Sequence, residues 1–362
     1  MDKLLEMTNK FPMTHYWNDS CSISELKYAL ERGAVGATTN PVIVKQVLEN
    51  NMVRYNDYII SLVKDYPRES EDEIAWRVIE KMAIDGASLL LPLFKPDQWT
   101  GRISIQTNTK NFNNTDRLLE QSIHFASLAP NIQVKIPATT AGLTAIEEAT
   151  FKGVSINATV SYSVPQAIAV AEAVERGLNR RTALNLEIDS ISPICTIMVG
   201  RLDDWLKYVV ERDQIRIPAI DPEVNVPNLN PLTPMDFAGI ACMKKAYNIY
   251  SERGYRTRLL TAAYRHQGHW TSFIGGNLSM TMPYRYQTQF NRSNAEITSH
   301  IDEQIPHNIL SILKEIPDFV KAYDGMPVDE FDYYGPVNKT LEQFAQGYDD
   351  LIRIIRRFFI KY

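Results

Sequence analysis

The chain has 362 residues, long enough to bury a large core, with apolar (44%) and charged (22%) fractions ordinary for a globular protein. Its net charge of −5 argues against a general nucleic-acid or membrane-surface binder. There is no run of about 18 apolar residues and no signal-peptide pattern. Cys21, Cys195 and Cys242 are widely spaced, as in reduced cytoplasmic proteins without disulfides or a zinc site. We therefore expect a cytoplasmic protein without a metal, nucleic-acid or membrane partner.

Short strands and helices alternate along most of the chain. Ser24 is expected to cap the first helix, and Pro41 stands at a favoured first-turn position of the second. Residues 221–234, which are rich in proline, are the clearest predicted loop. Strands are predicted over 15–19, 35–41, 101–108, 133–137, 153–159, 188–199, 258–264 and 277–282. Helices are predicted over 25–32, 42–50, 55–64, 71–91, 116–128, 141–152, 163–177, 202–212, 236–253 and 341–360.

This alternation predicts an α/β fold with a parallel sheet. Eight strand–helix units make a closed (β/α)8 TIM barrel the natural candidate. The tail departs from the alternation, because it is polar and aromatic before its long amphipathic helix. We therefore predict a barrel over residues 1–283 and a helical C-terminal extension, packed on the barrel, over 284–362.

Lys135 lies in the middle of an apolar strand that Pro137 ends. An unpaired ammonium inside a sheet costs free energy, because the charge loses its hydration. Burial therefore lowers the pKa of a lysine, and a lowered pKa leaves more of the amine in the neutral form that attacks a carbonyl. The alternative is an outward-facing side chain that reaches solvent. Residues 153–159 form a second β-like run with polar residues in its interior. Two successive strands of this kind favour an inward-facing site at the rim of a barrel.

Several motifs stand in a consistent order over residues 14–283. They are Asp19, TTNP at 38–41, VKIPAT at 134–139, NAT at 157–159, VGRLDDW at 199–205 and AAYR at 262–265. Together they resemble the transaldolase family, including the fructose-6-phosphate aldolases. The resemblance implies a class I, Schiff-base (β/α)8 barrel that acts on ketose phosphates without a metal or organic cofactor.

The resemblance also implies roles for single residues. Lys135 is similar to the lysine that forms the imine, and Asp19 to the general acid/base that takes the C4 hydroxyl proton. Asn40 and Asn157 resemble the amides that bind substrate hydroxyls, and Thr159 the hydroxyl that holds the proton-shuttling water. For Asp19 alone, helix capping is the alternative, and for the residues of 157–159 it is a polar strand edge.

Arg201 and Arg265 resemble the family's phosphate site. Each follows a predicted strand, and guanidinium forks match phosphate oxygens bidentately. Taken singly, each would read as a solvated surface arginine. We therefore expect a sugar phosphate or a related anionic sugar as the small-molecule partner, and the resemblance is compatible with a homo-oligomer.

Three positions depart from the family pattern. Gln106 stands where transaldolases carry a glutamate, and the fructose-6-phosphate aldolases also have a glutamine at this position. In those aldolases the glutamine pairs with a tyrosine, whose matching position in this chain is Met198. Ala263 replaces a serine that commonly joins the phosphate arginines. We expect transfer of a dihydroxyacetone unit to an aldehyde to dominate. The alternatives are an aldolase that releases free dihydroxyacetone, a transaldolase that acts on a sulfonated sugar, and a non-catalytic sugar-phosphate-binding barrel.

Overall fold

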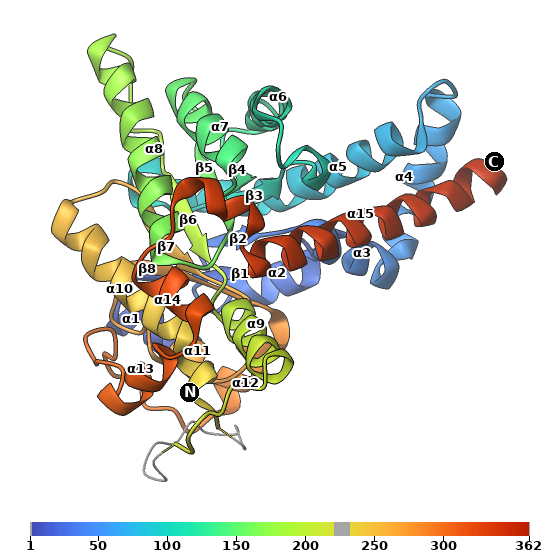
Figure 1. The fold of residues 1–362 in the computed structure, drawn as a ribbon. Coiled ribbons are helices and arrows are strands. Elements are labelled where there is room, and N and C mark those ends of the chain that lie inside the picture. Colours follow the sequence, from blue (N-terminus) through green and yellow to red (C-terminus); the bar gives the residue numbers. More distant parts are fainter. Residues whose placement is uncertain (1, 221–231, 362) are drawn as a thin grey trace.

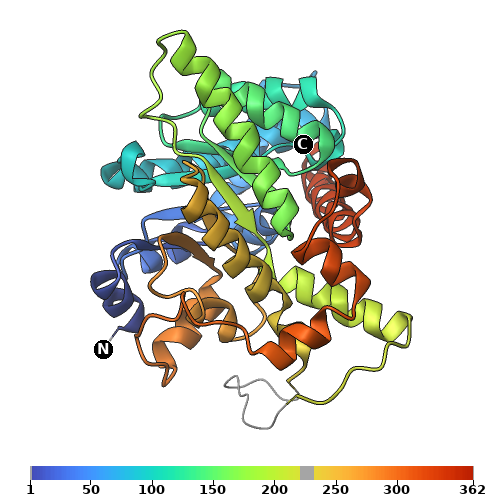
Figure 2. The same cartoon turned by 60° about the vertical axis from the view of Figure 1, so that its left-hand side comes forward.

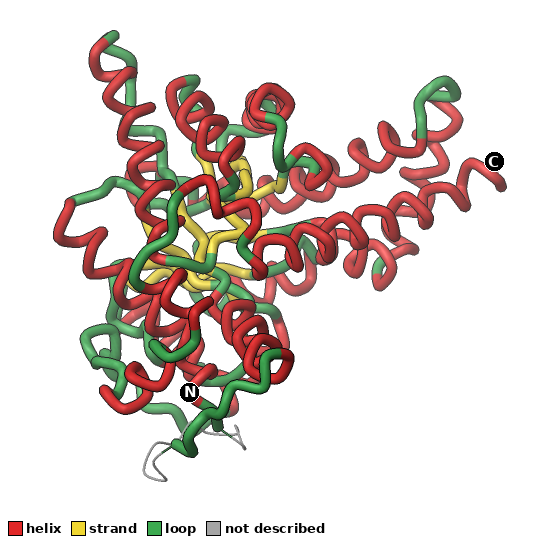
Figure 3. The backbone as a smooth tube through the Cα atoms, in the orientation of Figure 1, coloured by secondary structure: helices red, strands yellow, loops and turns green. Residues whose placement is uncertain are grey.

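A closed parallel barrel forms the centre of the protein, with its eight strands in chain order. The computed structural model describes residues 2–220 and 232–361. Figure 3 shows the strands at the centre, surrounded by helices. The predicted (β/α)8 fold is confirmed. The strands are β1 (Thr14–Asn18), β2 (Gly36–Thr38), β3 (Arg102–Gln106), β4 (Ile132–Pro137), β5 (Ile156–Ser161), β6 (Ile194–Ile197), β7 (Arg258–Thr261) and β8 (Leu278–Met282).

Helices and short 3-10 turns cover the barrel. They arise where the apolar period changes from two to about 3.6 residues. The helices are α1 (Lys3–Lys10), α2 (Ile23–Leu30), α3 (Pro41–Asn50), α4 (Met52–Asp65), α5 (Glu71–Leu90), α6 (Thr115–Ala126), α7 (Thr140–Phe151), α8 (Val164–Ala183), α9 (Val199–Arg212), α10 (Ala238–Arg253), α11 (Gly268–Thr271), α12 (Tyr284–Arg292), α13 (His307–Leu313), α14 (Pro317–Tyr323) and α15 (Gly335–Lys361). The 3-10 helices are η1 (Leu91–Leu93), η2 (Pro96–Gln98), η3 (Thr109–Asn111), η4 (Pro234–Phe237) and η5 (Val328–Tyr333). None of the described helices is both long enough and apolar enough to cross a membrane.

The strand register brings polar residues from three neighbouring strands to one level. Gln106 at the end of β3 pairs with Lys135 of β4, and Lys135 pairs with Asn157 of β5. One step further along, Pro137 pairs with Thr159. Paired residues of a parallel sheet project from the same face, so the side chains of Gln106, Lys135 and Asn157 line one level of the barrel and Thr159 lies at the next.

The C-terminal helix α15 crosses from the barrel to the helical insertion formed by α3, α4 and α5 (Figure 1). The Tyr348 hydroxyl donates to Asp72 Oδ1 at 2.7 Å, and its ring stacks on Trp76 with centroids 5.6 Å apart. Further along, Arg356 pairs with Glu71 at 2.7 Å. Figures 1 and 2 place the first turns of α15 beside α9, which follows strand β6. The amphipathic tail thus reaches the part of the barrel where site residues are expected.

Several predicted details are wrong. Ser24 does not cap α2; the N-cap is Ser22, and the two hydroxyls lie 3.0 Å apart. The predicted strand over 188–199 pairs only as β6, because Ile191 is buried without joining the sheet and Val199 already begins α9. The strand predicted over 258–264 ends at Thr261, and α8 runs past residue 177 to Ala183. Most of the predicted proline-rich loop, 221–231, lies outside the described residues.

Candidate active site

Lys135 points into the barrel and is almost fully buried, with 4% of its surface exposed. Its Nζ donates a hydrogen bond to the Thr39 carbonyl oxygen at 3.2 Å. Burial lowers the pKa of Lys135 from 10.5 to about 8. The negative charge of Asp19 opposes this shift, and the positive charge of Arg201 adds a smaller lowering. The outward-facing alternative is therefore wrong. A substantial fraction of this amine is neutral, and hence nucleophilic, near physiological pH.

Asp19 follows β1 directly, at the carboxyl end of the barrel. Its Oδ1 accepts a hydrogen bond from Thr38 Oγ1 at 2.7 Å, while its backbone N–H donates to the Met282 carbonyl at 3.0 Å. Burial raises the pKa of the Asp19 carboxyl, and Lys135 and Thr38 oppose that shift. The N-cap of the next helix is Ser22, so Asp19 does not cap it. A carboxyl with a raised pKa, coupled to a lysine with a lowered pKa, is an arrangement suited to proton transfer.

The Asn157 side chain is fixed by the polar layer inside the barrel. Its Nδ2 donates to Ser104 Oγ at 3.0 Å, and its Oδ1 accepts from Thr196 Oγ1 at 2.6 Å. Asn40 caps α3 by accepting from the Ile43 N–H at 3.0 Å. In both residues the side-chain oxygen is hydrogen-bonded, and among the described residues at least one amide N–H of each has no partner and is left for a ligand hydroxyl.

Two predicted site residues carry buried oxygens without a protein partner among the described residues. These are Gln106 Oε1 and Thr159 Oγ1. A buried polar atom left unpaired costs about 1–3 kcal/mol, so such atoms close to Lys135 indicate a site built for a polar ligand or ordered water. The next residue, Val160, has a φ of 54° beside a bulge between Ala158 and Ser161. A β-branched residue in the left-handed region is strained, and such strain is concentrated at functional sites.

Arg201 and Arg265 line one small pocket together with residues from the C-terminal helix. Arg201, in the first turn of α9, donates from Nη1 to Thr340 Oγ1 at 3.1 Å and to Gln343 Oε1. Burial lowers the pKa of Arg201. Arg265 Nε donates to Asp204 Oδ2 at 2.8 Å. The structure thus brings the two predicted arginines together, within a shell of hydrogen-bond partners.

Two buried side chains, the carboxylate of Asp203 and the imidazole of His269, fix the backbone of Arg265. His269 Nε2 donates to Asp203 Oδ2 at 2.7 Å, and His269 Nδ1 accepts the Arg265 backbone N–H at 3.0 Å. Gly239 N–H donates to the other Asp203 oxygen at 2.9 Å. Burial is the largest cause of the lowered pKa of His269, which keeps the imidazole neutral.

The same carboxylate, with His266 and His269, is the group of described residues whose spacing could hold a metal ion. The hydrogen bonds argue against that use. A metal-bound imidazole normally donates its second N–H to an acceptor, whereas the second nitrogen of His269 accepts one. His266 Nε2 faces the Asp236 carbonyl at 3.1 Å and therefore carries a proton as well. The cluster is consequently better described as a hydrogen-bonded group that fixes the backbone of Arg265, and we call it the brace.

Sequence reasoning missed Thr340 and Gln343, which hold Arg201, and Tyr162, which is buried close to Arg201. No local pattern marks the two α15 residues, because their role depends on where a distant helix docks. Of the departures from the family pattern, Met198 is buried at the start of α9. Ala263 has a φ of 63°, and its carbonyl accepts from Arg265 Nη1 at 2.9 Å.

Comparison with known proteins places the chain in a family. The family model described as transaldolase/fructose-6-phosphate aldolase matches residues 16–353. A transaldolase from Thiobacillus denitrificans is 28% identical over 231 residues, which cover 62% of this chain and 59% of that protein. A transaldolase from Mycobacterium ulcerans is 25% identical over 225 residues, covering 61% and 56%. Transaldolase 2 from Streptomyces avermitilis is 30% identical over 185 residues, covering 48% and 46%.

The chain thus spans about half to three fifths of the length of these relatives, from 46% to 59%. The family model reaches much further, from β1 to within α15. The chain belongs to the transaldolase/fructose-6-phosphate aldolase family.

Proposed function

We propose that this protein transfers a dihydroxyacetone unit from a ketose phosphate, or a similar anionic ketose, to an aldehyde acceptor through a Schiff base on Lys135. The observation that carries the proposal is the buried amine on β4 with its lowered pKa, electrostatically coupled to Asp19. Family membership supports the same chemistry.

The first step is attack of the neutral Lys135 amine on the ketose carbonyl, followed by loss of water to give the iminium. Water must be held while protons move to and from the carbinolamine oxygen. Gln106 Oε1 and Thr159 Oγ1 are assigned this role, since both are buried and lack a protein partner among the described residues. A glutamine amide can orient water but cannot take up a proton at neutral pH.

Carbon–carbon cleavage is assigned to Asp19. Its carboxylate removes the proton of the C4 hydroxyl, the C3–C4 bond breaks, and the electron pair enters the iminium to form an enamine. The aldehyde fragment leaves, and an acceptor aldehyde takes its place. The reverse steps form the new bond, return the proton from Asp19 to the product hydroxyl, and release the product by hydrolysis of the imine. Burial, which raises the pKa of Asp19, suits a group that both takes and returns a proton.

Substrate binding is assigned to the remaining predicted residues. Asn40 and Asn157 use their free amide N–H groups for the hydroxyls of the dihydroxyacetone unit. Arg201 and Arg265 bind the terminal anion, because two guanidinium groups lining one pocket favour a tetrahedral anionic group. Both a phosphate and a sulfonate meet this description. A chain that only binds sugars would need neither the buried lysine nor the coupled carboxyl.

Release of free dihydroxyacetone is the competing outcome within the same chemistry. The aldolase branch resembles this chain at Gln106, but the buried side chain of Met198 offers no hydroxyl to hold water at the position of the aldolase tyrosine. We therefore assign transfer as the main reaction, with slow release as a side reaction.

Product analysis with and without an acceptor aldehyde tests this assignment. Fructose 6-phosphate and its sulfonated analogue serve as donors, and Lys135→Met serves as the inactive control. Products are expected to form rapidly only when the acceptor is present. Release of dihydroxyacetone at full rate without acceptor would instead identify an aldolase. Equal turnover of a ketose without an anionic group would contradict the arginine site.

A further inference from the structure

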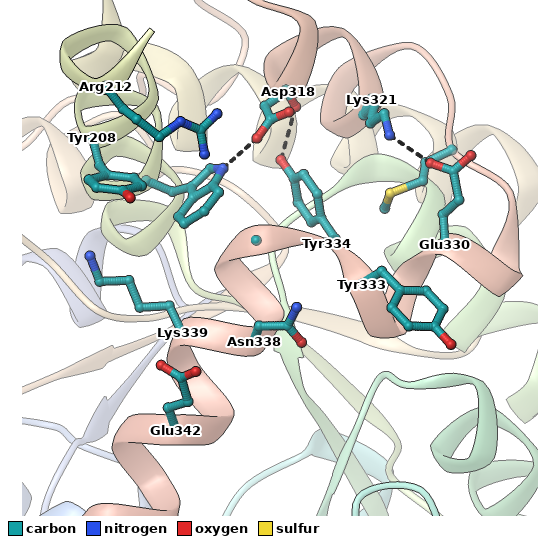
Figure 4. A pocket seen from close by; sticks show the side chains of 13 residues that line it. Tyr208, Arg212, Asp318, Lys321, Glu330, Tyr333, Tyr334, Asn338, Lys339 and Glu342 are labelled. Carbon is teal, nitrogen blue, oxygen red and sulfur yellow. Dashed lines mark hydrogen bonds and ion pairs between the residues drawn. The ribbon is translucent and has the colours of Figure 1, made fainter.

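A second cavity, of about 640 Å³, lies outside the barrel between α9, α14, η5 and the first turns of α15 (Figure 4). Its volume is in the range of about 300–1,000 Å³ that is typical of small-molecule sites. Trp205 and Lys339 line both this outer cavity and the small pocket of Arg201 and Arg265. The outer cavity is therefore a direct neighbour of the proposed anion site, although none of the reaction steps uses it.

One wall of the outer cavity is aromatic, and its Trp205 ring is held by contacts with α14 and with the start of α15. Trp205 and Tyr208 lie on one face of α9, with ring centroids 5.3 Å apart. Trp205 Nε1 donates to Asp318 Oδ2 at 2.6 Å. A Cβ at Gly335 would lie 1.8 Å from Trp205 Cζ2, so only glycine allows α15 to begin against this ring. Tyr208 is 43% exposed, and Tyr333, in η5, is 81% exposed.

Lys339 is the cation of this cavity that remains available. Lys321 pairs with Glu330 at 2.7 Å, and Arg212 pairs with its neighbour Asp213 at 2.6 Å. Lys339 forms no ion pair with a carboxylate in the part of the chain that the structure describes; its Nζ lies 5.0 Å from the centre of the Tyr208 ring. An anionic group bound next to this ring could pair with Lys339 without displacing a carboxylate.

These features specify the chemistry of a ligand. Exposed aromatic faces bind the C–H face of a sugar ring, and the amide of Asn338 and the carboxylate of Glu342 can meet ring hydroxyls (Figure 4). Lys339 can then form an ion pair with the anionic group of the ligand. We propose that the outer cavity binds a phosphorylated carbohydrate as a second site, separate from the imine site. This binding stands whether or not Lys135 forms an imine.

Calorimetric titration of the Lys135→Met protein with glucose 6-phosphate tests the proposal without turnover. Two sites per chain are expected. Tyr208→Ala should weaken binding at the outer cavity about 10-fold or more and leave binding at the pocket of Arg201 and Arg265 unchanged. Arg265→Ala should weaken binding at that pocket and leave binding at the outer cavity unchanged. Lys27→Ala removes an exposed lysine of α2 and serves as the control. A single site that Arg265→Ala abolishes and Tyr208→Ala leaves unchanged would overturn the proposal.

A second measurement needs no substitution at Lys135. Brief acetylation with acetic anhydride, read out by peptide mass spectrometry, reports the accessibility of Lys339 relative to Lys27. Glucose 6-phosphate is expected to protect Lys339 even in Arg265→Ala protein, and this protection should be lost in Tyr208→Ala protein. Protection of Lys339 that disappears with Arg265→Ala would place the ligand in the arginine pocket only and would also overturn the proposal.

Discussion

The pKa of Lys135 gives the sharpest quantitative expectation. At pH 7, an amine with a pKa of about 8 is about 10% neutral, whereas one with a pKa of 10.5 is about 0.03% neutral, a difference of about 300-fold. The second-order rate constant of imine formation, measured at donor concentrations well below saturation, should therefore rise with pH to a midpoint near 8. Because Arg201 lowers this pKa and Asp19 raises it, Arg201→Gln should move the midpoint up and Asp19→Asn should move it down.

The assay is the rate of covalent adduct formation in the presence of cyanoborohydride, followed by intact mass between about pH 6 and 10. It reports the amine without requiring cleavage, so Asp19→Asn protein can be measured. Arg212→Gln, at the far end of the same helix, is the matched control and should leave the midpoint unchanged. A midpoint near 10 in the wild type, or opposite shifts in the two variants, would refute the reasoning.

The same pKa has a consequence for stability. Between about pH 8 and 10.5 the unfolded chain holds a proton that folded Lys135 has lost, so this group's contribution to the free energy of unfolding rises with pH in that window. Below pH 8 burial of Lys135 costs up to about 3 kcal/mol. Lys135→Met should therefore stabilise the protein more at pH 7 than at pH 10, as measured by urea denaturation. A uniform effect at both pH values would contradict this.

Asp19→Asn should retain the trapped adduct but lower the cleavage rate by about 10²- to 10⁴-fold, because an amide cannot take the hydroxyl proton; near-normal cleavage would move the base elsewhere. Asp203→Asn weakens the hold of His269 on the backbone of Arg265, and should raise KM for the anionic ketose about 10-fold while leaving kcat nearly unchanged. An unchanged KM would argue against the brace. Gly335→Ala should lower stability by about 1–3 kcal/mol in thermal denaturation, because its Cβ meets the Trp205 ring; an unchanged melting temperature would contradict that contact.

The sequence predicts those parts of the site that depend on local pattern. Lys135 stands in an apolar strand, Asp19 ends another, and the order of the motifs resembles a known family. The barrel register then places Gln106, Lys135 and Asn157 at one level, as expected for parallel neighbours. Strand ends are predicted less well. Apolar patterns report burial rather than pairing, which is why β6 is shorter than its apolar run.

The features of the site that the sequence does not predict depend on how elements distant in the chain pack against one another. Thr340 and Gln343 reach Arg201 only because α15 packs beside α9, over 130 positions along the chain from that arginine. The φ of 54° at Val160 has no sequence signal, since a valine favours extended backbone. The outer cavity likewise exists only because Gly335 lets the start of α15 lie against Trp205.

The central claim is that Lys135 carries the covalent step, and borohydride reduction in the presence of fructose 6-phosphate tests it most directly. Intact mass should show one stable adduct per wild-type chain, and peptide mapping should place it on Lys135. Lys135→Met, which keeps the length of the side chain and removes the amine, should show no adduct and no turnover. An adduct that persists in this variant, or that maps to another lysine such as Lys110, would contradict the assignment.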